Sequence, residues 1–316
     1  MKSISFVIPC YRSGKTLPVV IDELTNEMNK IKDYQYEVIC VNDASPDNTF
    51  EVIKELCAKN ENMVGIDLAK NFGQHSAIMA GLNCAWGDII ISLDDDGQMP
   101  LESIPSLISK IEQGVDVVFG RYINKKHSRF RNLGSLVNDK MCSVLLEKPK
   151  ELYVSSFWGM KKFVAQEMIK YEGAYPYLLG LILRVTRNID NIDVEHRERS
   201  DGQTGYSLLK LLSLWMNGFT AFSVKPLRLA TIFGVLSSMT GFIYGIVMII
   251  RKIINPNILL GYSSLLVVNL FLGGMLMFIL GIVGEYIGRI YICINNSPQY
   301  VVRRVVGVRT EITKRK

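Results

Sequence analysis

Short apolar runs alternate with polar and amphipathic stretches along the first third of the chain. Buried strands are predicted at residues 4–8, 36–41, 63–67, 88–93 and 115–119. Helices are predicted between them, near residues 17–31, 49–59, 76–86 and 101–113. A regular alternation of strand and helix is typical of βαβ units, so we predict an α/β domain with a mainly parallel sheet over residues 1–205.

Two uncharged stretches closer to the carboxyl terminus are each longer than the roughly 20 residues that a helix needs to cross a bilayer. They cover residues 229–250 and 258–284. Their many Gly and Ser residues would allow close helix packing in lipid, and the short link at 251–257 makes the pair a hairpin. A buried helical core could imitate one such stretch, but two in tandem favour transmembrane helices within residues 229–291.

The segments on either side of this hairpin also suggest a membrane surface. Residues 206–221, within a linking segment at 206–228, are apolar with one Trp and few charges, which is typical of an interfacial amphipathic helix. A core helix packed on the sheet is the alternative. Residues 292–316 form a basic tail whose six Lys and Arg, against one Glu, supply +5 of the formal net charge of +6. The charge therefore indicates anchoring near anionic lipid, with no nucleic-acid partner.

The amino terminus carries no signal-peptide pattern, because Met1-Lys2-Ser3 leads directly into the first predicted strand. We therefore expect the α/β domain to stay in the cytoplasm, and the hairpin to return the tail to the same side. Arg251 and Lys252 in the outer link count against this orientation. The six cysteines have no paired C-x-x-C spacing, which predicts reduced thiols and no zinc site.

Three consecutive carboxylates, Asp94, Asp95 and Asp96, directly follow the apolar run at 88–93. Open α/β sheets bind ligands at the carboxyl ends of their strands, and two aspartates two residues apart share one side of an extended chain. Oxygen donors of this kind suit Mg²⁺ or Mn²⁺, which usually complete their shell with substrate phosphates. The sequence thus predicts a metal site for a nucleotide diphosphate at Asp94 and Asp96; a polar Asp-Gly turn is the alternative.

Other polar segments also follow predicted strands and should lie near these carboxylates. They are residues 9–11, 42–43, 71–74 and 120–121. The chain has neither a G-x-G-x-x-G fingerprint nor a P-loop, which disfavours nicotinamide cofactors and ATPase chemistry.

Several of these segments together resemble one known family over nearly the whole chain. The resemblance rests on Val7-Ile8-Pro9 with Tyr11, Val41–Ser45 with Asp47 and Thr49, Asn71–Gly81, Asp94-x-Asp96 with Gln98 and Pro100, and Gly284–Tyr291. These motifs are similar to those of the polyprenyl-phosphate glycosyltransferases, which are inverting family 2 enzymes with a GT-A fold. The resemblance implies transfer of a sugar from a nucleotide diphosphate, with UDP expected, to a polyprenyl phosphate such as undecaprenyl phosphate. It also implies a multi-pass protein of the bacterial inner membrane, and leaves a homo-oligomer open.

The resemblance also implies roles for individual residues. Asp94 and Asp96 would hold the metal, and together with Gln98 and Arg131 would form the catalytic group. The nucleotide would contact Pro9, Tyr11, Asp43 and Asp95, and the lipid phosphate would contact Arg129, Arg131, Arg199 and Arg289. Alternatives stay open for three of these: Asp43 as a turn or helix cap, the basic stretch at 121–131 as a solvated loop, and Arg289 as an ion-pair partner of Glu285 four residues earlier.

Three departures from the family pattern affect the site. Arg12-Ser13 follows Tyr11 where relatives have Asn-Glu, Gly205 replaces a Lys, and Ser156-Phe157-Trp158 replaces an acidic residue followed by Phe-Arg. A phosphate monoester is largely ionised at pH 7, since its second pKa is about 6, so an acceptor of this class needs no base. A noncatalytic scaffold that binds the sugar donor or lipid carrier is one alternative. A processive polysaccharide synthase is the other, although its Gln-x-x-Arg-Trp motif is missing.

Overall fold

The computed structural model describes most of the chain as two separate units. The described residues are 2–31, 33–123, 148–149, 151–195, 225–255, 262–295 and 297–307. One unit comprises residues 1–206 together with 296–316, and the other comprises residues 207–295.

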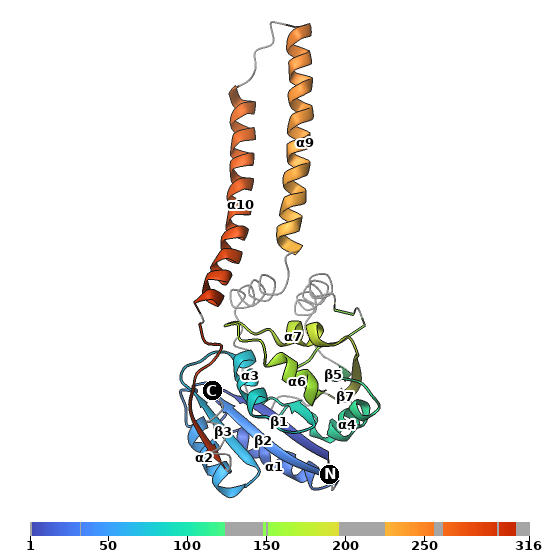
Figure 1. The fold of residues 1–316 in the computed structure, drawn as a ribbon, viewed down its shortest axis with the longest axis vertical. Coiled ribbons are helices and arrows are strands. Elements are labelled where there is room, and N and C mark those ends of the chain that lie inside the picture. The colour runs from blue at the N-terminus through green and yellow to red at the C-terminus, as the bar shows by residue number, and fades with distance from the viewer. Residues whose placement is uncertain are drawn as a thin grey trace. The chain divides into compact units, whose positions relative to one another are not determined.

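The first unit alternates strands and helices in the order that the sequence predicts (Figure 1). Its first part runs β1 (Lys2–Cys10), α1 (Leu17–Met28), β2 (Tyr34–Asn42), α2 (Thr49–Lys59), β3 (Met63–Leu68), α3 (Gln74–Cys84), β4 (Ile89–Ser92), a short 3₁₀ turn η1 (Leu101–Ser103), α4 (Ile104–Glu112) and β5 (Val117–Ile123). All five predicted strands and all four predicted helices are therefore confirmed.

Four further elements of this unit have no counterpart among the predicted ones, and one strand comes from the basic tail. They are β6 (Trp158–Lys161), α6 (Lys162–Met168), α7 (Leu178–Val185) and β7 (Ile189–Glu195), followed after the second unit by β8 (Val302–Gly307). The eight strands form one sheet in the order β7-β5-β6-β4-β1-β2-β3-β8. β1, β2, β3 and β4 are mutually parallel, whereas β6 and β8 pair antiparallel with their neighbours. The sheet is mainly parallel, as predicted.

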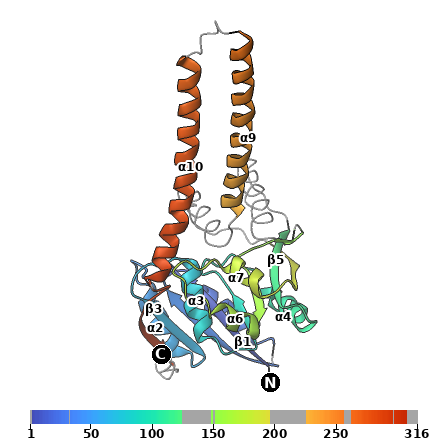
Figure 2. The same ribbon diagram turned by 45° about the horizontal axis from the view of Figure 1, so that its top comes forward.

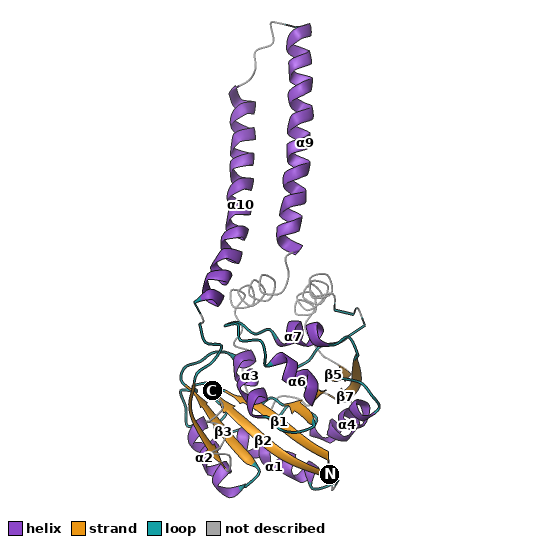
Figure 3. Ribbon diagram, viewed as in Figure 1, coloured by secondary structure: helices purple, strands orange, loops and turns teal. Residues whose placement is uncertain are grey.

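Helices lie against the sheet (Figure 3), and apolar side chains on both of its faces pack under them. Ile4, Phe6 and Ile8 of β1 belong to one buried cluster with the inner faces of α1, α2 and α4. Val7 points to the other face, where α3 packs so closely that a Cβ on Gly81 would lie 2.4 Å from a Val7 methyl carbon. Burial on both faces explains why the strands read as continuous apolar runs.

The second unit consists of two long apolar helices that run side by side in opposite directions (Figure 2). They are α9 (Lys225–Ile254) and α10 (Tyr262–Ile294), and the Ser237 hydroxyl of α9 lies 3.5 Å from the Met275 sulfur of α10. By length and composition, both can cross a membrane: windows at 230–247 and 271–292 have mean hydropathies of 1.6 and 1.8. α10 extends ten residues past its predicted end at 284. Most of the predicted interfacial segment, residues 206–224, lies outside the described residues.

Candidate active site

Four loops meet at one edge of the sheet, where the parallel strands β1 to β4 end. Hydrogen bonds join the loops in pairs. The Tyr11 amide donates to an Asp95 carboxylate oxygen at 3.0 Å, and the Phe72 amide donates to Asp43 at 2.7 Å. The Gln74 side-chain amide donates to Asp94 at 3.0 Å. The predicted ligand-facing segments after these four strands therefore do lie together.

Asp94 is the first of the three half-buried aspartates that follow β4. Its carboxylate accepts hydrogen bonds from the side chains of Gln74 and Ser156. Burial, opposed by the Ser156 hydrogen bond and reinforced by the charges of Asp96 and Asp95, raises the pKa of Asp94 to about 6. A carboxylate in this setting carries negative charge that its own neighbours do not balance.

Asp96 and Gln98 form a tight turn next to Asp94. The backbone amide of Gln98 donates to the Asp96 carboxylate at 3.0 Å. Gly97 between them has a φ of +71°, a conformation that favours glycine. Within the described part of the chain, the buried Nε2 of Gln98 has no hydrogen-bond partner. A buried amide donor of this kind can bind an oxygen atom of a ligand.

Asp94 and Asp96 fit the requirements of a divalent cation. They supply two hard oxygen donors, and Mg²⁺ commonly binds to one or two carboxylates while substrate phosphates and water complete its shell. No cluster of three or more His, Cys, Asp or Glu side chains suited to a metal occurs among the described residues. The remaining ligands of a metal held here would therefore come from the substrate and water.

Asp95 connects the loop after β1 to the loop after β4. Besides the Tyr11 amide, its carboxylate accepts a hydrogen bond from the Ser13 hydroxyl, and burial raises its pKa. Arg12 between these donors has a φ of +61°, and its guanidinium lies 5.6 Å from the centre of the exposed Tyr11 ring. Ser13, one of the departures from the family pattern, thus serves here as a donor to a carboxylate.

Asp43 is buried and binds the loop that leads into α3. Its two carboxylate oxygens accept from the backbone amides of Phe72 and Gly73, at 2.7 and 2.9 Å. Burial raises the pKa of Asp43, although these two hydrogen bonds act in the opposite direction. These contacts support the alternative that Asp43 caps a turn or helix. Each carboxylate oxygen of Asp43 nevertheless keeps a second lone pair for a ligand. Pro9 is the penultimate residue of β1, opposite Val41 of β2.

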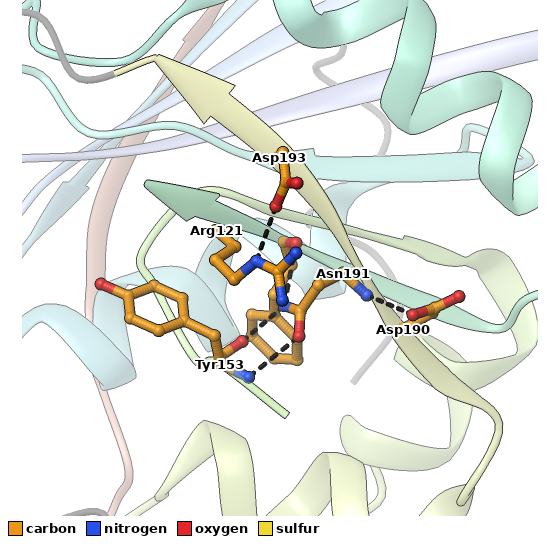
Figure 4. A network of polar contacts seen from close by, with 6 residues as sticks. Arg121, Tyr153, Asp190, Asn191 and Asp193 are labelled. Atoms are coloured by element: carbon orange, nitrogen blue, oxygen red, sulfur yellow. Dashed lines mark hydrogen bonds and ion pairs between the residues drawn. The ribbon is translucent and has the colours of Figure 1, made fainter. Parts of the chain in front are cut away.

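A polar network fixes the segment that carries Ser156 (Figure 4). The Asn191 side chain of β7 accepts from the Tyr153 amide at 2.9 Å and donates to the Tyr153 and Phe119 carbonyls at 2.7 and 3.1 Å. Arg121, predicted to begin a basic loop, instead bonds to Asp193 of β7 at 2.6 Å. This network holds residues 151–157 beside β5.

Sequence reasoning missed several contributors to this site. Ser156 contacts Asp94, and Tyr122 lies close enough that burial and then the charge of Asp94 raise the pKa of its hydroxyl. Tyr122 lies within β5, beyond the predicted end of that strand at residue 119, and Ser156 was singled out only as a departure from the family pattern. Neither interaction with Asp94 was foreseen. Gln74 lay within a motif of the family, but its contact with Asp94 was not foreseen.

The predicted basic ligands of the lipid phosphate have no described side chains. Arg129, Arg131 and Arg199 lie outside the described residues. Arg289 belongs to α10, and its side chain also lies outside what the structure describes.

The sequence model described as glycosyl transferase family 2 matches residues 5–169, which cover β1 to α6 and the four loops. The chain belongs to glycosyl transferase family 2. A second model, described as the GtrB C-terminal hairpin, matches residues 225–290 of the α9–α10 unit. The α/β unit thus has the GT-A type of fold, and the predicted order of transferase domain and apolar hairpin is confirmed.

Three relatives match the chain over nearly its full length. The uncharacterized glycosyltransferase YkcC of Bacillus subtilis (strain 168) is 33% identical, with 97% of this chain and 95% of the relative covered. The undecaprenyl-phosphate 4-deoxy-4-formamido-L-arabinose transferase of Proteus mirabilis (strain HI4320) is 32% identical, with 98% and 95% covered. The prophage bactoprenol glucosyl transferase homolog of Escherichia coli (strain K12) is 34% identical, with 96% and 99% covered.

Solved structures resemble the fold more distantly. A crystal structure of a mycobacterial protein aligns with a TM-score of 0.50 at 17% identity, over 68% of this chain and 74% of that chain. A glucosyl-3-phosphoglycerate synthase from Mycobacterium tuberculosis, crystallised with Mn²⁺ and UDP, aligns with a TM-score of 0.49 at 18% identity, over 67% and 74%. The first likeness shows the fold alone.

Proposed function

We propose that this family 2 transferase moves a sugar from a nucleotide diphosphate sugar to a polyprenyl phosphate. The observation that carries the proposal is the convergence of Asp43 with Asp94, Asp95 and Asp96 at one sheet edge of a family 2 domain. The acceptor class is supported by two relatives named for undecaprenyl phosphate and bactoprenol, each matched along at least 96% of this chain. We expect UDP as the nucleotide and undecaprenyl phosphate as the carrier.

In the proposed reaction, an oxygen of the acceptor phosphate attacks the anomeric carbon of the sugar. The bond between that carbon and the nucleoside diphosphate breaks, and the configuration inverts. The acceptor needs no base, because its second pKa of about 6 leaves it largely ionised at pH 7. Ser156, which stands beside Asp94 in place of an acidic residue, is compatible with a base-free attack.

We assign each residue of the site one task in this reaction. Asp94 and Asp96 would hold Mg²⁺ or Mn²⁺, which when bound would neutralise charge on the leaving diphosphate. Gln98 would donate its unpaired Nε2 hydrogen to a sugar or phosphate oxygen. The remaining assignments are nucleotide contacts at Pro9, Tyr11, Asp43 and Asp95, and lipid-phosphate contacts at Arg129, Arg131, Arg199 and Arg289.

We further propose that catalysis takes place at the cytoplasmic face of a bacterial inner membrane. The two apolar helices would anchor the domain there, and residues 206–228 would lie in the headgroup region at the height of the lipid phosphate. Arginine suits that phosphate, because its planar fork forms two parallel hydrogen bonds to an oxyanion.

The test is transfer by the full-length protein in membranes supplied with undecaprenyl phosphate and a panel of nucleotide sugars. Mass analysis of the lipid fraction should show one sugar added to the phosphate with one donor of the panel. Undecaprenol serves as the control acceptor and should give no product. Equal use of undecaprenol would refute the phosphate acceptor, and a polymeric product would indicate a processive synthase. Donor binding without any transfer would indicate a noncatalytic scaffold.

A further inference from the structure

The strand that follows the hairpin brings an arginine to a buried carboxylate of the sheet. Arg304 of β8 stands directly opposite Asp67 of β3, and its Nε donates to the Asp67 carboxylate at 2.9 Å. The Asp67 side chain is only 3% exposed, whereas that of Arg304 is 48% exposed. The Arg304 guanidinium also lies 4.2 Å from the centre of the Phe50 ring, which fixes its plane.

Asp67 in turn fixes the side chain at the end of the next strand. Asn42 of β2 is the cross-strand neighbour of Asp67, and its Nδ2 donates to the second Asp67 carboxylate oxygen at 2.7 Å. An ionised carboxylate can only accept hydrogen bonds, so the amide nitrogen of Asn42 must face Asp67. The Asn42 carbonyl oxygen therefore points the other way and accepts from the Ser45 amide at 3.2 Å.

Ser45 connects the two loops that flank the proposed nucleotide pocket. Its hydroxyl oxygen accepts from the Arg12 amide at 2.7 Å, so it joins the loop after β2 to the loop after β1. Arg12 and Ala44 have φ values of +61° and +48°, and they are the two non-glycine residues with positive φ in the described chain. Such backbone conformations persist only where surrounding contacts hold them.

We propose that Arg304 is a positioning residue for nucleotide binding, acting through Asp67, Asn42 and Ser45 on the loops that carry Asp43 and Tyr11. This inference rests on the proposed function, since it names the donor nucleotide as the ligand of those loops. The strand after the hairpin would thereby support the donor site from outside the four loops.

The physical basis is that Arg304 holds the Asp67 carboxylate, which in turn holds the Asn42 side chain. Both side chains lose their fixed orientation when the arginine is removed. Without the guanidinium, the Asp67 carboxylate is a buried negative charge that has lost the cation paired with it, which is energetically unfavourable. Relief comes from water entry or from a shift of β8, and either would displace the Asp67 carboxylate that holds the Asn42 amide. The Ser45 amide then loses its fixed acceptor, and the two strained residues relax.

The kinetic test compares Arg304→Ala with Arg303→Ala in the full-length protein. Arg303 is the matched control, because it is the neighbouring arginine of the same strand and donates to the Ala69 carbonyl at 2.7 Å, away from Asp67. Arg304→Ala should raise KM for the sugar donor by roughly tenfold or more while kcat changes less, since misplaced binding loops weaken ground-state and transition-state binding alike. Arg303→Ala should leave both constants near those of the wild type.

Two further variants show whether Arg304 acts through Asp67. Arg304→Lys should recover part of the donor affinity, because an ammonium restores the charge but not the planar contact with Phe50. Asp67→Asn should raise KM as well, and the double variant Arg304→Ala/Asp67→Asn should show less than the product of the two single effects. Independent, multiplicative effects would overturn the proposed relay. If Arg304→Ala fails to fold, Arg304→Lys and Asp67→Asn still decide the question.

Hydrogen exchange gives a readout that does not depend on transfer. The backbone amides of Ser45 and Arg12 should exchange faster in Arg304→Ala than in the wild type, and at the wild-type rate in Arg303→Ala. Unchanged exchange at both amides together with an unchanged donor KM would refute the inference. Wild-type protein that transfers no sugar would instead refute the proposed function, and the exchange rates would still report on the relay.

Discussion

The three aspartates after β4 have different surroundings, although they are consecutive in the chain. Asp95 accepts hydrogen bonds from Tyr11 and Ser13 and so holds the loop after β1. Asp94 contacts the side chains of Gln74 and Ser156, and Asp96 caps the turn at Gln98. The middle residue of the triplet thus has a clear architectural task, which leaves the outer two as the better candidates for a metal. A role of Asp95 in nucleotide binding stays a prediction.

At this scale we predict that Asp96→Asn lowers the rate of sugar transfer by at least about a hundredfold, the range found when a group that stabilises transition-state charge is lost. The variant keeps the size of the side chain but removes one anionic ligand. Initial rates at saturating donor and Mn²⁺ measure the effect, and Asp22→Asn on the exposed face of α1 is the control. Full wild-type activity in excess chelator would rule out the metal role.

How much of the site could be predicted from the sequence depends on how far apart in the chain its contacts lie. Asp94 and Asp96 follow a recognisable buried strand, so their position at the sheet edge could be predicted from local pattern. Ser13 reaches Asp95 across 82 residues, and Ser156 reaches Asp94 across 62. No local pattern records such pairings, because they arise only when the strands are assembled.

At the scale of single elements, the start of α2 depends on the carboxylate of Asp47. Although partial burial acts in the opposite direction, hydrogen bonds from the hydroxyls of Ser45 and Thr49 and from the amides of Thr49 and Gly14 lower its pKa from 3.8 to about 2. A lowered folded-state pKa stabilises the fold above pH 3.8, and this contribution is lost as the pH falls towards 2.

We therefore predict that Asp47→Asn destabilises the protein at pH 7 by on the order of 1 kcal/mol, after allowance for solvent screening. The difference from the wild type should shrink as the pH falls from about 4 to about 2, because the wild-type carboxylate is then protonated. Thermal unfolding of both proteins in detergent at several pH values measures this difference. A difference that stays constant across this interval would show that charge is not the cause.

The packing of α3 on the sheet depends on Gly81, whose missing side chain lets the helix approach β1. A methyl group there would lie 2.4 Å from the Val7 side chain, so Gly81→Ala should lower stability by about 1–3 kcal/mol. It should also lower transfer, since the first residue of α3 is Gln74, which contacts Asp94. Asn83→Ala on the exposed side of the same helix is the control and should change stability by at most about 0.5 kcal/mol.

Two of the three strands that sequence reasoning missed pair antiparallel with distant partners. β6 has four residues and pairs antiparallel with β4 and β5, and β8 pairs antiparallel with β3 from the far end of the chain. The Val and Arg residues of β8 suit a half-exposed edge strand, but the same residues also read as a basic membrane-proximal tail. Strands that gain their stability from a distant partner carry too weak a local signal to be assigned.

At the scale of the whole molecule, β8 determines which parts of the chain must lie on the same side of a membrane. Residues 302–307 pair with β3 within the sheet formed by residues 2–195, so the segments before α9 and after α10 belong to one folded unit. A folded sheet cannot be divided by a bilayer. The two apolar helices must therefore cross an even number of times if they cross at all, and the link between them must face the opposite side.

We predict that a cysteine at position 255, one residue after the end of α9, is labelled from outside the cell by a membrane-impermeant maleimide. A cysteine at the exposed position 59, at the end of α2, should be labelled only after the membrane is opened. Labelling of the wild-type protein measures the contribution of native cysteines, of which Cys10, Cys40 and Cys57 are buried. Both engineered positions reacting from the same side would contradict a two-pass hairpin. Position 59 reacting from outside would place the transferase domain on the wrong face for a cytoplasmic sugar donor.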